Sequence, residues 1–99
     1  MTVDWDVDFT EYELRVLYKI CQCGIVCNRH MQEESLCRSV KKHEVGFVKD
    51  ALKMLIKKEA IHRYKSQNRY DYCIKRENFK HALSLLNRYS STYGWIVEI

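Results

Sequence analysis

The chain has 99 residues, of which 46% are hydrophobic and none is proline. This length suits one domain over residues 1–99, and the composition excludes a disordered or low-complexity protein. No apolar run approaches the roughly 20 residues that a membrane span requires, and the acidic first residues lack the layout of a signal peptide. We therefore expect one cytoplasmic domain without membrane attachment.

Charge is segregated along the chain, although the formal net charge is only +4. Residues 1–13 hold five acidic residues and no basic one, whereas residues 38–69 hold ten basic residues against three acidic ones. A polyanion would be attracted to the middle of the chain and repelled by its beginning.

The N-terminal stretch alternates apolar and acidic residues, with Val3, Trp5, Val7 and Phe9 separated by aspartates. A second alternating stretch covers residues 93–99 and follows a break at residues 90–92. This period of two is typical of strands. Three arrangements are consistent with the pattern: pairing within the chain, pairing across a dimer, or two arms packed on the helices without pairing.

The first helix is expected over residues 11–23. Thr10 and Glu13 form a capping box, in which the hydroxyl accepts from the third helical amide and the carboxylate returns to the cap amide. Gly24 suits the left-handed residue that ends a helix. A small strand at residues 25–27, a cap at Asn28 and a second helix over residues 29–37 are expected to follow, with a turn at residues 38–42.

The third helix is expected over residues 43–58. Its core stripe consists of residues at steps of three and four, namely Val45, Val48, Leu52, Leu55 and Ile56. Lys42, His43, Gly46, Lys49, Lys53 and Lys57 fall largely on other sides. Lysines on a helix are often simply solvated, so this pattern alone does not separate DNA binding from an ordinary surface.

A hairpin and a final helix complete the chain. Two runs rich in aromatic and β-branched residues, 61–65 and 70–74, flank a polar tip at residues 66–69. We expect Tyr70, Tyr72 and Ile74 to share the inner face. Helical spacing of apolar residues then predicts a helix over residues 77–90.

The five cysteines, Cys21, Cys23, Cys27, Cys37 and Cys73, cannot all pair within one chain because their number is odd. We favour buried free thiols, which pack as small hydrophobic groups. Disulfides are the second interpretation. Zinc is the third, because Cys21, Cys23, Cys27 and His30 are close in sequence but lack a paired C-x2-C motif.

The order of helix, short strand, two helices, hairpin and helix resembles the winged helix-turn-helix family. The best match is VGFVKDALKMLIKKEAIHRYKSQNRYDYCI, residues 45–74, which is similar to that family's recognition helix, strand start and tyrosine-bearing return strand. The short form resembles MarR and SlyA regulators and small viral winged-helix proteins of thermophilic archaea. Glu59 stands where the family usually has glycine, and the chain ends sooner than full-length MarR proteins.

The resemblance implies an α+β, mainly helical fold with a hairpin wing and a C-terminal dimerisation helix. The acidic arm or strand would cover residues 1–9 and the winged-helix core residues 10–74. Residues 77–99, with Tyr89, Tyr93 and Trp95, and the first helix would form the interface of a homodimer. Such a protein would associate with the nucleoid, or act in host cytoplasm if it is viral.

The implied function is sequence-specific binding of double-stranded DNA by a transcriptional regulator. Helix 43–58 would enter the major groove and hairpin 61–74 would act as the wing. Lysine dominates, so phosphate contact is better supported than base readout. The candidate DNA-binding residues are Arg29, Arg38, Lys41, Lys42, His43, Gly46, Lys49, Lys53, Arg63, Lys65, Gln67, Asn68 and Arg69.

Two alternatives keep the same fold. A protein-interaction module would use the acidic arm to bind a basic partner, and a redox or metal sensor would use the cysteines. Catalysis is disfavoured because the sequence has no Gly-rich phosphate loop and no metalloprotease motif, and its histidines are scattered. We expect no catalytic residues, no resident metal and no cofactor.

Overall fold

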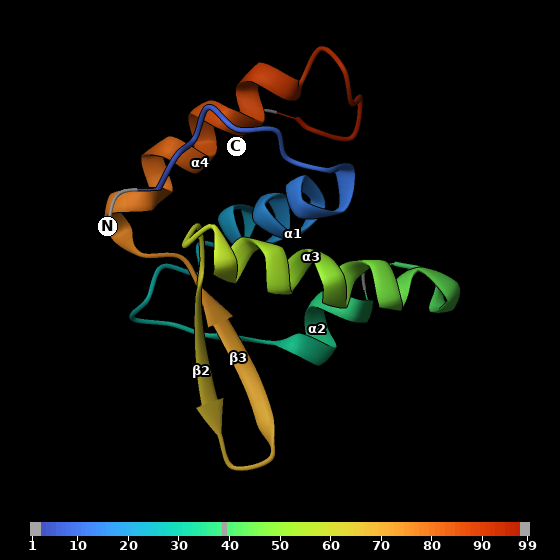
Figure 1. The fold of residues 1–99 in the computed structure, drawn as a ribbon, viewed down its shortest axis with the longest axis vertical. Coiled ribbons are helices and arrows are strands. Elements are labelled where there is room, and N and C mark those ends of the chain that lie inside the picture. The colour runs from blue at the N-terminus through green and yellow to red at the C-terminus, as the bar shows by residue number, and fades with distance from the viewer. Residues whose placement is uncertain (1–2, 39, 98–99) are drawn as a thin grey trace.

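The computed structural model describes residues 3–38 and 40–97 and shows a mainly helical α+β fold (Figure 1). The described residues form four α-helices and a small antiparallel sheet whose three strands have the order β1-β3-β2. The elements are α1 (Glu11–Gln22), β1 (Met31–Gln32), α2 (Glu33–Arg38), the 3-10 helix η1 (Lys42–Glu44), α3 (Val45–Lys57), β2 (His62–Ser66), β3 (Arg69–Cys73) and α4 (Arg76–Tyr89).

The core lies where α1 packs against both α3 and α4. Figure 1 shows α1 between the other two helices, and both pairs are in contact. Each helix contributes side chains that are at most 1% exposed, among them Leu17 of α1, Leu55 of α3 and Leu86 of α4. Removing this apolar area from water is the main term that holds the helices together.

The expected start of α1 is confirmed. Thr10 Oγ1 accepts from the Glu13 amide at 3.3 Å, while its hydroxyl donates to the Glu13 carboxylate at 2.9 Å. The carboxylate therefore meets the cap hydroxyl rather than the cap amide that we expected. The helix ends at Gln22, and Gly24 has a φ of 64°, as its left-handed role requires.

The prediction for residues 25–37 was wrong in two respects. Val26 forms only an isolated bridge with Ile74, and the strand is Met31–Gln32, which pairs with β3. Helix α2 begins at Glu33, so Asn28 is not its cap. The physical reason is that residues 26–32 are bonded to distant residues 71–74 of β3 and its extension, which overrides the local helical pattern.

The third helix and the hairpin follow the expected order. Of the expected stripe, Val48, Leu52 and Leu55 are buried, whereas Val45 and Ile56 are half-buried. The helix proper starts at Val45 after one turn of 3-10 helix. The chain leaves α3 through Glu59, whose φ is 62°. A left-handed residue thus does occur where the family usually has glycine.

The hairpin of β2 and β3 extends away from the helices and turns at residues 67–68 (Figure 1). Tyr72 and Ile74 are buried as expected. Tyr70 lies on the same face as Tyr72 but is 36% exposed, so the expectation that it is buried with them was wrong. The physical reason is that Tyr70 lies nearer the tip, beyond the helices that cover Tyr72. Asp71 is buried on the opposite side of β3.

Neither residues 3–9 nor residues 93–97 form a strand, so the unpaired alternative describes these arms. The rings of Trp5 and His81 on α4 stack at 5.9 Å, and Arg88 donates to the Trp5 carbonyl at 2.9 Å. The other arm brings Trp95 edge-on to Tyr18 of α1 at 5.6 Å. Ile99, named in the expected pairing, lies outside the described residues. Over the described part of the chain, no helix is long and apolar enough to cross a membrane.

Candidate nucleic-acid interface

Helix α3 exposes its lysines on the side opposite its buried stripe. Lys49 and Lys53 are exposed, and within residues 3–38 and 40–97 neither forms an ion pair. Burial, followed by the charge of Glu33, raises the pKa of Cys37 on α2, and the positive charge of Lys49 partly opposes this shift. The positive charge on this face is therefore available to an external anion.

The beginning of α3 adds further exposed groups. Lys41 precedes η1, which carries Lys42 and His43, and all three are exposed. The nearest carboxylate to His43 is Glu44, at 4.0 Å. Gly46 is exposed, and a Cβ built there would meet no atom within 4 Å, so a surface could approach its backbone closely.

The hairpin carries basic side chains on both of its faces. Arg63 and Lys65 pair with Tyr72 and Tyr70 in the register, so these four residues share one face. The Arg63 guanidinium lies over the Tyr70 ring at 4.5 Å. On the other face Arg69 donates to the Asp71 carboxylate at 3.2 Å, which neutralises much of its charge. Gln67 and Asn68 form the exposed tip, as expected.

The two remaining candidate arginines lie on other elements. Arg38 at the end of α2 pairs with Glu34 at 2.9 Å, although both side chains are about 70% exposed. Arg29 lies in the exposed turn before β1, where its amide donates to the Val26 carbonyl. Helix α2, which carries Arg38, contacts both α3 and β3.

Sequence reasoning did not distinguish Lys58 from the other lysines of the basic stretch. Its ammonium is hydrogen-bonded to the buried carboxylate of Glu13, donates to the Asp8 carbonyl at 2.9 Å and lies over the Phe9 ring. Lys58 therefore joins α3 to α1 and to the N-terminal arm. No local sequence signal predicts this pairing, because the partners are 45 residues apart.

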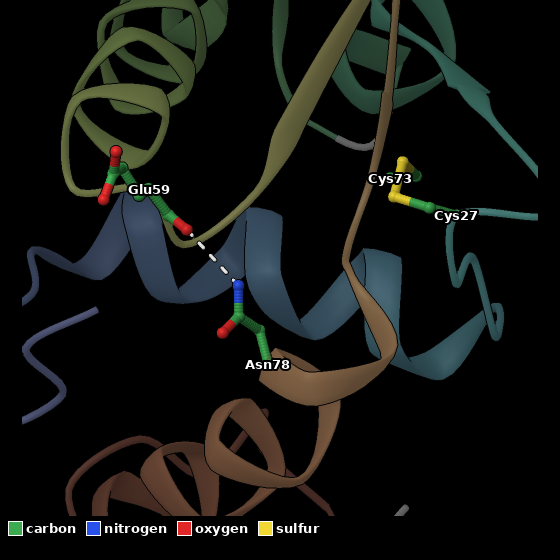
Figure 2. The surroundings of a disulfide bond; sticks show 4 residues. All are labelled: Cys27, Glu59, Cys73 and Asn78. Atoms are coloured by element: carbon green, nitrogen blue, oxygen red, sulfur yellow. Dashed lines mark hydrogen bonds between the residues drawn. A yellow bond between two sulfur atoms is a disulfide. The ribbon is translucent and has the colours of Figure 1, made fainter. Parts of the chain in front are cut away.

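Disulfide formation, the second interpretation of the cysteines, is confirmed for one pair. Cys27 and Cys73 form a disulfide that ties the loop before β1 to the end of β3 (Figure 2). Burial raises the pKa of the free Cys21 thiol to about 12, and Cys23 is exposed. The disulfide removes Cys27 from the cluster considered for zinc, and the described side chains contain no group of three metal ligands.

Tyr72 was not among the candidate residues, yet it links the hairpin to α2. Its hydroxyl donates to Glu33 at 2.8 Å, and burial, followed by this bond, raises the pKa of Tyr72.

Comparison with protein families, curated proteins and solved structures finds no match for this chain. Its function must therefore be argued from its own residues, which are suited to binding an anion along α3 and the hairpin.

Proposed function

We propose that the chain is a winged helix-turn-helix protein that binds double-stranded DNA and regulates transcription. The observation that carries this proposal is the face of α3 that exposes Lys49 and Lys53 without an ion-paired carboxylate in the described structure. Elsewhere several bases are neutralised, as Arg15 is by Glu11 and Lys58 by Glu13. Unneutralised cations on a rigid helix favour a polyanionic partner.

The shape of α3 supports major-groove binding. Its 13 residues span about 20 Å, and the major groove admits an α-helix. The buried stripe of Val48, Leu52 and Leu55 fixes the helix on the core, so its exposed face is held in one orientation. In this proposal α3 lies in the groove with Lys49 and Lys53 on the phosphates that border it.

The hairpin would act as the wing. Arg63 and Lys65 contact phosphates, while Gln67 and Asn68 at the tip reach base edges in the neighbouring minor groove. Lys41 and Lys42 bind the backbone at the other end of α3. In a homodimer, two such surfaces would address half-sites about one helical turn apart, which makes a pseudo-palindromic target the natural one.

The test is a salt series on duplex DNA. We expect wild-type binding to weaken steeply with salt, and Lys49→Ala/Lys53→Ala to weaken it by about tenfold or more and lower the salt slope by about two. The matched control is Lys19→Ala/Lys80→Ala, which removes the same charge from α1 and α4. Its sedimentation mass must equal that of the wild type, because both helices are expected at the dimer interface. Fluorescence anisotropy with a labelled 30-base-pair duplex gives both quantities.

Two results would count against the proposal. Duplex affinity that is equal in the α3 variant and in the control would remove α3 from the contact surface. Absence of binding even at the lowest salt would reject DNA as the partner. Circular dichroism of each variant, measured in the same buffer, separates loss of contact from loss of fold.

A protein-interaction module is the second candidate, and one observation favours it. Phe47 is 55% exposed and Met54 is 42% exposed on α3, and the Phe47 ring stacks on Tyr12 of α1 at 5.2 Å. Exposed apolar side chains on one helix are typical of protein interfaces. A partner whose binding is lost in Phe47→Ser but kept in Lys49→Ala/Lys53→Ala would support this candidate over DNA binding.

A further inference from the structure

A cleft of about 660 Å³ lies beside the proposed DNA-binding surface and shares Arg63 with it. It is formed by the N-terminal arm, the end of α3, the start of β2 and the start of α4. Its volume is within the range of pockets that hold small organic ligands. The lining residues are Val3, Trp5, Ile56, Glu59, Ile61, His62, Arg63, Lys75, Glu77, Asn78 and His81.

Three nearly parallel rings lead into this cleft. Phe9 and Trp5 stack with centroids 6.0 Å apart and an interplanar angle of 17°, and Trp5 and His81 stack at 5.9 Å and 15°. Phe9 is buried, whereas His81 is exposed and lines the cleft. The row thus ends in the cleft, where a further planar ring would extend it by offset stacking.

The charges of the lining balance. Glu59 and Glu77 contribute two carboxylates, and Arg63 and Lys75 contribute two cations. The Arg63 guanidinium also lies over the Tyr70 ring. A ligand with a full net charge would therefore gain little from this lining, whereas a neutral one would not suffer repulsion.

Polar groups with both donor and acceptor capacity complete the lining. The Asn78 side-chain nitrogen donates to the Glu59 carbonyl at 3.3 Å, which fixes the side-chain amide in the first turn of α4 (Figure 2). Its amide oxygen takes no part in that bond, and the His62 imidazole can donate and accept. Ile56 and Ile61 supply the apolar surface between them.

We propose that this cleft binds a neutral, planar nitrogen heterocycle of the nucleobase class, either as a free nucleoside or as an unpaired base of a strand. The ring stacks on His81 at the end of the Phe9–Trp5–His81 row. Its polar edge meets Asn78 and His62. Because Ile56 lies in the last turn of α3 and His62 is the first residue of β2, the bound ring also touches both elements assigned to DNA.

Tryptophan fluorescence tests the site without DNA. The chain has two tryptophans, so Trp95→Phe leaves Trp5 as the single reporter in an otherwise full chain. At pH 8, where imidazoles are ordinarily neutral, adenosine should change Trp5 emission saturably. Benzoate and benzylamine, which carry opposite full charges, should bind at least about fivefold more weakly if the balanced lining selects neutral rings.

A second variant identifies the stacking partner. We expect His81→Ala in the same background to weaken adenosine binding by about three- to tenfold, the range of one aromatic pair. His30→Ala, which removes an exposed imidazole from the loop before β1, is the control and should leave binding unchanged. Titration with a single-stranded oligonucleotide, with and without the His81 change, shows whether a base within a strand uses the same site.

The result that overturns the proposal is the absence of any His81-dependent binding, of adenosine or of the oligonucleotide. Tighter binding of benzoate or benzylamine than of adenosine would reject the neutral class. Saturation-transfer NMR observes adenosine directly, so it detects binding even if Trp5 emission does not change. None of these outcomes depends on whether α3 binds duplex DNA.

Discussion

Lys58 and Glu13 show how a single pair of residues fixes the position of α3. Glu13 is 2% exposed, and its carboxylate accepts both from Thr10 and from Lys58. A buried carboxylate without a cation would be strongly destabilising, so the two residues depend on each other. The same lysine donates to the Asp8 carbonyl, which anchors the acidic arm at the end of α3.

Glu59 carries a backbone cost that glycine would remove. Its φ of 62° lies in the left-handed region, which costs a non-glycine residue about 1 kcal/mol. Its carbonyl bond to Asn78 uses only the backbone and would survive the change. We therefore expect Glu59→Gly to stabilise the fold by about 1 kcal/mol, measured by urea unfolding.

Gly24 provides the matched control for that prediction. Its φ is 64° and a Cβ there would meet no atom within 4 Å, so only the backbone responds to substitution. Gly24→Ala should destabilise the fold by about 1 kcal/mol. If Glu59→Gly were destabilising while Gly24→Ala behaved as expected, the Glu59 side chain would have a stabilising role that outweighs its backbone cost.

Cys21 and Cys23 should differ sharply in reactivity. Burial raises the pKa of Cys21 to about 12, whereas Cys23 is exposed. At pH 8 we expect iodoacetamide to modify Cys23 at least about 100-fold faster than Cys21, because only the thiolate reacts. Mass spectrometry of the native protein measures both rates, and urea should abolish the difference.

The raised pKa of Cys21 also makes the free energy of unfolding depend on pH. Unfolding returns the thiol of Cys21 to its ordinary pKa of 9.0, below the folded value. Its contribution to stability is therefore complete below pH 9 and is lost as the pH rises towards 12. A rise in stability over that range, after comparison with Cys21→Ala, would contradict the assigned burial.

At the scale of elements, the helices and strands that depend on local residue spacing were predicted from the sequence. The capping residue Thr10, the buried stripe of α3 and the two strands of the hairpin were all predicted from spacings of two to four residues. Helix α2 was placed wrongly because its start depends on the pairing of Met31 with Tyr72, 41 positions away. Local periodicity carries no information on such a contact.

The features of the candidate site also divide into those that local spacing predicts and those that depend on tertiary contacts. The exposure of Lys49 and Lys53 follows from helical spacing, so it was predictable. The use of Lys58 inside the fold was not, because its partner Glu13 lies 45 residues away and is brought to it only by the tertiary structure. The Cys27–Cys73 pair could not be selected from five cysteines without the same information.

The disulfide should provide much of the stability of the sheet. It closes a loop of 46 residues that contains α2, α3 and β2, and the chain-entropy estimate for that length is about 4 kcal/mol. We expect dithiothreitol to lower the free energy of unfolding by up to this amount. Cys27→Ala/Cys73→Ala should behave like the reduced protein and be insensitive to dithiothreitol.

An unchanged unfolding midpoint on reduction would contradict that role. Cys23→Ala is the control, since it removes an exposed thiol but leaves the pair intact. Reduced and oxidised samples must be compared at matched pH, because thiol exchange depends on the thiolate fraction.

For the whole molecule, the aromatic residues expected at a dimer interface are also packed within the chain. Trp95 lies 5.6 Å from the Tyr18 ring and 5.5 Å from the Tyr93 ring, and the Arg15 guanidinium lies over it at 4.8 Å. The second arm therefore covers part of α1 itself. A homodimer, which stays a prediction, would have to use surface that this arm leaves free.

Trp95→Ala separates the two roles of that arm. If Trp95 packs within its own chain, the change should destabilise the fold by about 2–3 kcal/mol through lost burial and ring contacts, and the sedimentation mass should not change. Trp95→Phe should recover most of the stability because it keeps a ring against Tyr18. A dimer that dissociates in Trp95→Ala, with unfolding unchanged, would instead place Trp95 in an interface between chains.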